Sequence, residues 1–87
     1  MNAISELSVV LCSINSPAVM RKFLSELQTP SELKDLTLRW RLMKMLKLGR
    51  TQREIARDLK ISLCKITRGS RIIKNRASVT NKVIKVN

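Results

Sequence analysis

Short apolar segments, each preceded by a helix-capping signal, are the feature of this sequence that most restricts its fold. Ser16 followed by Pro17 is typical of an N-cap and first helical residue, because proline lacks the N–H that would be unpaired there. Thr29-Pro30-Ser31-Glu32 and Thr51-Gln52-Arg53-Glu54 match capping boxes, in which a threonine hydroxyl and a glutamate carboxylate satisfy opposite backbone donors. These signals predict an all-α fold, a small helical bundle.

Apolar residues recur at helical spacing around these signals. We expect helices from Ile4 to Ile14, from Pro17 to about Leu27, and from Pro30 to about Leu48, the last ending at Gly49. The long third helix carries two apolar stripes at different angles: Leu33, Leu36, Trp40, Met43 and Leu46, and then Leu38, Leu42 and Met45. Two faces predict contact on two sides, one with the chain's own core and one with a partner in a homodimer. The alternative is a single wide core stripe in a monomer.

The charge is strongly basic and unevenly distributed. The 87 residues contain 18 Lys plus Arg against 6 Asp plus Glu. Residues 1–32 contain two bases and three acids, whereas no acidic residue follows Asp58. Such an excess exceeds what solubility requires and indicates a polyanionic partner, with a solvated basic face as the alternative.

Several classes of protein are excluded or disfavoured. The N-terminus shows no signal-peptide pattern and no apolar run reaches membrane-spanning length, so we expect a cytoplasmic protein without a membrane partner. Cys12 and Cys64 lie far apart without neighbouring ligand residues, so we expect two small packing residues and no metal site. The chain has no His and no Tyr, and its few carboxylates are scattered. No acid–base pair is evident, and we do not expect an enzyme or a cofactor.

Residues 52–68 have the pattern of a helix-turn-helix. Ala56 is small enough to let two helices approach, Ile61 fills the angle between them, and Ile66 packs beneath the second helix, which Ser62 caps. Lys60 occupies the turn position where glycine is most common, at a cost of roughly 1 kcal/mol for a left-handed conformation. The alternative is a pair of antiparallel helices that pack together without binding DNA.

This geometry predicts a DNA-contacting surface. Leu63, Cys64 and Lys65 at the start of the second helix would meet base edges in the major groove of duplex DNA, with Thr67 one turn further on. Gln52 and Arg53 at the start of the first helix would hold a phosphate and so position the protein without reading sequence.

Four segments together resemble the tryptophan repressor family: Thr29-Pro30-Ser31-Glu32, Arg39-Trp40-Arg41, Gln52-Arg53-Glu54 and, most specifically, Thr67-Arg68-Gly69-Ser70. The resemblance covers residues 27–70 well and the preceding helices more loosely. It implies an intertwined all-helical homodimer that binds L-tryptophan as a corepressor and then docks two reading helices on operator DNA. It also implies a helical domain over residues 1–74, followed by a basic tail over residues 75–87.

The resemblance also assigns ligand-contacting residues. Arg39 from one subunit and Arg68 from the other would sandwich the indole between guanidinium planes, a favourable stacking geometry. Gly69 would let the ligand lie against the helix. Thr29, with the last carbonyls of the preceding helix near Leu27 and Gln28, would receive the ammonium group.

Three features depart from the family pattern. Ile72 stands where the family has a serine near the ligand ammonium, the loop between Gly49 and Gln52 is one residue shorter, and the tail is basic where the family has an acidic helix. We expect the tail to be a flexible phosphate-contacting arm, because its β-branched residues and asparagines have weak helical preference. Two alternative functions follow: a DNA-binding protein that has lost its effector, and an RNA-binding module. The second is disfavoured because one Trp and one Phe are all that could stack on bases.

Overall fold

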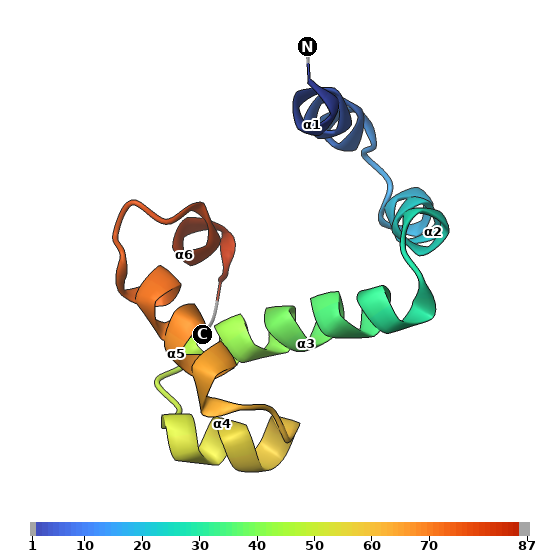
Figure 1. Cartoon of the computed structure of the whole chain (residues 1–87). Coiled ribbons are helices and arrows are strands. Elements are labelled where there is room, and N and C mark those ends of the chain that lie inside the picture. The colour runs from blue at the N-terminus through green and yellow to red at the C-terminus, as the bar shows by residue number, and fades with distance from the viewer. Residues whose placement is uncertain (1, 86–87) are drawn as a thin grey trace. The chain divides into compact units, whose positions relative to one another are not determined.

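The computed structural model describes residues 2–85. All the regular secondary structure in these residues is helical, as the capping signals predicted (Figure 1). Its helices in chain order are α1 (Ala3–Ser13), α2 (Pro17–Leu27), α3 (Pro30–Lys47), α4 (Gln52–Leu59), α5 (Leu63–Lys74) and α6 (Val79–Val83). The chain divides into two compact units, Met1–Lys34 and Asp35–Asn87, which are described separately.

Side-chain caps begin each helix of the first unit. The Asn2 side chain accepts a hydrogen bond from the Ser5 N–H at 2.9 Å and so begins α1. Ser16 caps α2 with Pro17 in its first turn, as predicted. The apolar side chains of these two helices remain largely on the surface, and neither helix contains a buried residue. The exposed ones include Ile4, Val9, Val10, Val19 and Leu27.

The predicted capping box at the start of α3 is present. The Thr29 N–H donates to Glu32 Oε1 at 2.9 Å, and the Glu32 N–H donates to Thr29 Oγ1 at 3.1 Å. Hydrogen bonding to the Glu32 carboxylate from the Thr29 backbone first, and from the Thr29 side chain second, lowers the pKa of Glu32 because both stabilise its charged form.

The core of the second unit joins α3, α4 and α5. Leu42, Ile55, Leu59 and Ile66 are buried, with Ile55 and Ile66 fully so. Partly buried side chains surround them: Leu38, Met45, Leu46, Ala56 and Ile61. Full burial of one isoleucine contributes roughly 1.5–3 kcal/mol, so these few side chains carry much of the unit's stability. The second stripe of α3 faces this core, while Leu36 and Trp40 of the first stripe are exposed.

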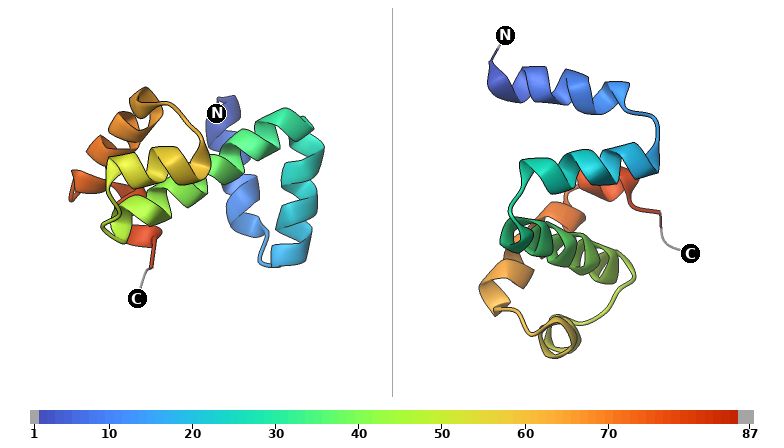
Figure 2. Two further views of the ribbon diagram at one scale, coloured as in Figure 1. Left: turned by 90° about the horizontal axis from the view of Figure 1, so that it is seen from below. Right: turned by 90° about the vertical axis from the view of Figure 1, so that its right-hand side faces the viewer.

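Helices α4 and α5 run in different directions and are joined by residues 60–62 (Figure 1, Figure 2). Thr51 and Glu54 form the predicted capping box, and Ser62 caps α5 by accepting from the Lys65 N–H. Lys60 ends α4 with φ 54° and ψ 47°, the left-handed conformation expected of the turn. Among the described residues it is the one non-glycine residue with positive φ; Gly49, after α3, has φ 86°.

The C-terminal segment differs from the flexible arm expected from its composition. Residues 79–83 form α6, which packs against α5, and Ile84 is buried with 2% exposure. Asn81 connects three elements, because it accepts hydrogen bonds from the Lys47 ammonium of α3 and donates one to the Ile73 carbonyl of α5. Tertiary contacts therefore outweigh the weak local helical preference. Residues 86–87 of the expected tail lie outside the described part.

Replacement of Lys60 by glycine should stabilise the protein. A left-handed conformation costs a side-chain-bearing residue about 1 kcal/mol and glycine little, so Lys60→Gly should raise the free energy of unfolding by about that amount. Urea denaturation followed by circular dichroism, at fixed protein concentration, measures the change. Lys60→Ala is the control, because it removes the side chain but keeps Cβ. A glycine variant no more stable than the alanine variant would contradict the strain.

Candidate nucleic-acid interface

One face of α5 gathers most of the residues predicted to meet base edges. Leu63, Cys64 and Thr67 line an open surface hollow of about 510 Å³ together with Arg68 and Arg71. Successive residues of an α-helix are about 100° apart, which places these five positions on one side of it. All five are exposed. Sequence reasoning missed Arg71, although its position one turn beyond Thr67 could have indicated it.

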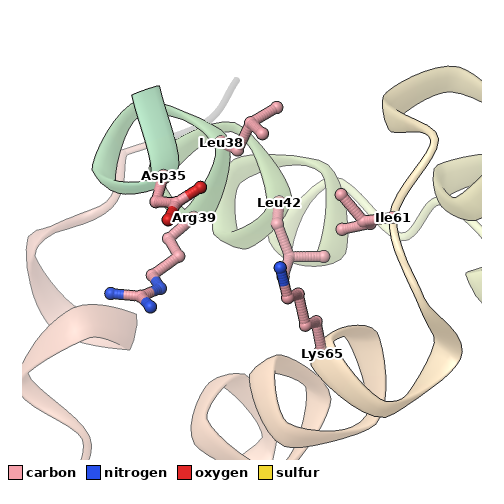
Figure 3. A pocket seen from close by; sticks show the side chains of 6 residues that line it. All are labelled: Asp35, Leu38, Arg39, Leu42, Ile61 and Lys65. Carbon is pink, nitrogen blue, oxygen red and sulfur yellow. The ribbon is translucent and has the colours of Figure 1, made fainter. Parts of the chain in front are cut away.

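Lys65 lies on a different side of α5 from this hollow. It is exposed and lines a small pocket of about 20 Å³ with Arg39. In Figure 3 its side chain points toward Leu42, and the remaining lining residues are Asp35, Leu38 and Ile61. The structure therefore brings a predicted base-reading residue beside a predicted ligand-contacting residue, which the sequence did not indicate.

The two cysteines are not packing residues. Cys12 and Cys64 are both free thiols and both exposed, which corrects the expectation of small buried side chains. Cys64 instead belongs to the exposed face of α5. Spacing alone could not separate the two roles, because cysteine is small enough for either.

The start of α4, which the sequence predicts to hold a phosphate, presents free backbone donors. The Glu54 N–H donates to Thr51 Oγ1 at 3.1 Å, whereas the amides of Gln52 and Arg53 have no partner among the described residues. Free amides and the positive end of the helix dipole both favour an anion there. The Gln52 and Arg53 side chains are exposed.

Two arginines hold the acidic residues of α4. Arg50 contacts Glu54 at 3.1 Å and Asp58 at 2.8 Å, and Arg57 contacts Asp58 at 3.3 Å. Hydrogen bonds from Thr51, and then from Arg50, lower the pKa of Glu54; hydrogen bonding to Arg57 is the first cause of the lowered pKa of Asp58. Both carboxylates are thus charged and locally neutralised at pH 7, which leaves the basic residues after Asp58 unopposed.

The predicted ligand residues of the second unit lie in two different pockets of the single chain. Arg39 lines the small pocket of Figure 3, and Arg68 lines the open hollow on α5; both side chains are exposed. Gly69 is buried against α3. A Cβ atom there would lie 3.1 Å from Leu46 Cδ1 and 3.2 Å from Leu42 Cδ2, so glycine at this position also permits the close approach of two helices.

Leu27, Gln28 and Thr29 lie at the end of α2 and the start of α3 in the first unit. Leu27 is half exposed, and Thr29 takes part in the capping box. The side-chain oxygen of Gln28 is buried and has no hydrogen-bond partner within residues 2–85. A buried acceptor without a donor is unfavourable, so Gln28 is a place where an N–H group of a ligand could bind.

The described residues contain no group of three or more His, Cys, Asp or Glu side chains placed to hold a metal ion. In the part of the chain that the structure describes, every helix is too short or too polar to cross a membrane.

Comparison with known proteins identifies the family. The family model described as "Trp repressor protein" matches residues 2–87. Proteins described as "Trp operon repressor homolog" from Xylella fastidiosa strains M23, Temecula1 / ATCC 700964 and 9a5c are each 39% identical over 62 residues, or 70% of this chain and 67% of the relative. No solved structure matches the chain. Because the family model spans nearly the whole sequence, this chain belongs to the Trp repressor protein family.

Proposed function

We propose that this chain represses transcription by binding operator DNA as a homodimer, with L-tryptophan as corepressor, and so controls genes of tryptophan metabolism. Membership in the family and the names of the relatives support the repressor function. The observation that carries the DNA-binding part is the α4–α5 pair. Its buried Ile55 and Ile66, its left-handed turn at Lys60 and its exposed α5 face are what a helix-turn-helix requires.

The pair would dock with α5 in the major groove and the start of α4 against the backbone. Leu63, Cys64 and Thr67 would face base edges from the exposed side of α5, and the longer Lys65 side chain would reach them from the adjoining side. Gln52 and Arg53 would hold phosphate. The basic surface supports this orientation, because no acidic residue follows Asp58 in the sequence.

Exposed apolar residues support the homodimer. Leu36 is 38% and Trp40 48% exposed, and helical spacing places both on a different side of α3 from the buried Leu42. Most of the apolar residues of α1 and α2 are exposed as well. A short chain with so few buried side chains gains core by association, and two copies would bury these faces.

A homodimer of this kind should unfold in a concentration-dependent manner. Folding and association would share one core, so the midpoint of thermal unfolding should rise with protein concentration. Sedimentation equilibrium at micromolar concentration gives the mass directly. Trp40→Glu, which places a charge on the exposed face of α3, should weaken association, whereas Lys34→Glu on the same helix is the polar control. A folded monomer with a fixed midpoint would remove the dimer.

Tryptophan binding is supported by the chemistry of the residues that the family resemblance assigned. Arg39 and Arg68 are exposed, so both guanidinium planes are available to stack on an indole, and Gln28 supplies a buried acceptor without a donor. Ile72, which stands where the family has a serine, is partly buried and cannot hydrogen-bond to a ligand. A ligand-independent DNA-binding protein is the second candidate, and Ile72 is the residue that favours it.

Calorimetric titration with L-tryptophan separates these two functions. Arg68→Ala should abolish measurable binding, because it removes one stacking plane. Ile72→Ser should tighten binding by about tenfold or more, the worth of one hydrogen bond to a charged group. Lys22→Ala, which changes a basic residue on α2 that is assigned no ligand contact, is the control. Absence of heat with the original protein, together with tryptophan-independent DNA binding, would favour the second candidate.

Lys65→Ala and Arg53→Ala should separate base reading from phosphate holding. Lys65→Ala should relax the preference at one base pair in each half-site by about 1–3 kcal/mol, whereas Arg53→Ala should weaken all sequences alike and reduce the salt slope by about one unit per site. Competition binding against a randomised operator library at several salt concentrations measures both effects. If Lys65→Ala changed tryptophan affinity and left base preference intact, Lys65 would belong to the pocket beside Arg39 and not to the groove.

A further inference from the structure

A second hollow in the second unit lies away from the exposed face of α5. It has a volume of about 250 Å³, several times the roughly 30 Å³ that a water molecule occupies in the liquid. The end of α3, the start of α4 and the second half of α5 form it. Its lining residues are Leu46, Gly49, Arg50, Thr51, Gln52, Ser70, Ile73 and Lys74.

Ser70 is the unusual member of this lining. Among residues 2–85 it is the one polar residue that is buried, with 7% of its surface exposed. Its hydroxyl has no hydrogen-bond partner among these residues. Its oxygen is not fully enclosed, and the residue lines the hollow, so the hydroxyl is accessible from there. Buried polar groups are almost always paired, so an unpaired hydroxyl at the wall of a hollow indicates a missing partner.

Three of the remaining lining residues supply a donor or a positive charge. The Gln52 N–H, in the first turn of α4, has no acceptor within residues 2–85, since the capping box pairs the Glu54 amide instead. Lys74, the last residue of α5, is exposed and makes no ion pair with a described residue. Arg50 adds positive charge, and its partners Glu54 and Asp58 do not line the hollow.

We propose that this hollow binds one phosphate oxyanion, with the Ser70 hydroxyl and the Gln52 N–H donating to its oxygens and Lys74 balancing its charge. A concavity that presents these donors beside a helix N-terminus, with a lysine among its lining residues, favours a tetrahedral anion over a neutral ligand. The phosphate can come from the DNA backbone, in which case the inference rests on the proposed function, or from a free phosphate. The site adds Ser70 and Lys74 to the residues that hold phosphate.

Phosphate titration of the DNA-free protein tests the site itself. We expect inorganic phosphate, at constant ionic strength against chloride, to shift the amide resonances of Gln52 and Ser70 in ¹⁵N-resolved spectra. Ser70→Ala and Lys74→Ala should each weaken this response about tenfold, whereas Lys22→Ala on α2 should not change it. Ser70→Ala should not lower the thermal midpoint, because the hydroxyl has no partner in the free protein to lose and alanine favours the helix.

The backbone donor can be tested separately at Gln52. Proline is tolerated in the first turn of a helix. It requires an extended conformation of the residue before it, and Thr51 already has one, with φ −71° and ψ 153°. Gln52→Pro removes the N–H and the side chain, and Gln52→Ala removes the side chain alone. Weaker phosphate binding in Gln52→Pro than in Gln52→Ala is therefore the expected signature of the amide.

Duplex DNA distinguishes the two sources of phosphate. If the Ser70→Ala and Lys74→Ala variants lose DNA affinity about tenfold beyond Lys22→Ala, the site takes a backbone phosphate. If they lose only the response to inorganic phosphate, it takes a free anion. If the unmodified protein did not bind DNA, the proposed function would be overturned, but the result of the phosphate titration would still hold. The proposed site would be overturned if the amide resonances of Gln52 and Ser70 shifted with neither phosphate nor DNA. It would also be overturned if chloride shifted them as much as phosphate does.

Discussion

The close approach of α5 to α3 at Gly69 is the contact on which the second unit depends. A Cβ atom at this position would lie 3.1 Å and 3.2 Å from the side chains of Leu46 and Leu42, tighter than ordinary van der Waals contact. The lack of a side chain lets Leu42 reach Ile66 and close the core shared with Ile55. The same packing directs the opposite face of α5 outward, and that face carries Leu63, Thr67 and the two arginines. The packing of the core and the outward orientation of this face of α5 therefore depend on one contact.

Much of the fold could be predicted because its signals are local. The capping boxes at Thr29 and Thr51 and the N-cap at Ser62 each depend on residues within one helical turn, and all three are present. The left-handed turn at Lys60 was expected for the same reason, since the motif fixes the conformation whatever residue fills it. Residues Ile55 and Ile66 followed from helical spacing.

Features that depend on contacts between residues far apart in the chain could not be predicted from the sequence. Composition predicted a flexible tail, whereas Asn81 joins α6 to α3 and α5, and Ile84 is buried. Spacing grouped Lys65 with the predicted base-reading residues, but it did not indicate that Lys65 and Arg39 line one pocket. Ser70 appeared only as part of a family pattern, because an unpaired buried hydroxyl becomes visible when three helices are placed together.

Glu54 makes two separate structures respond to acid in one step. Its Oε1 accepts from the Thr51 N–H and hydroxyl at the start of α4, while its Oε2 accepts from Arg50. These bonds lower the pKa of the carboxyl, so the stability they contribute is present at neutral pH and is lost as the pH falls through the folded-state pKa. A single proton on Glu54 therefore weakens its half of the capping box at Thr51 and also one of the two ion pairs that orient Arg50. Acidification should therefore loosen the first helix of the pair before it reaches the uncharged core of Ile55 and Ile66.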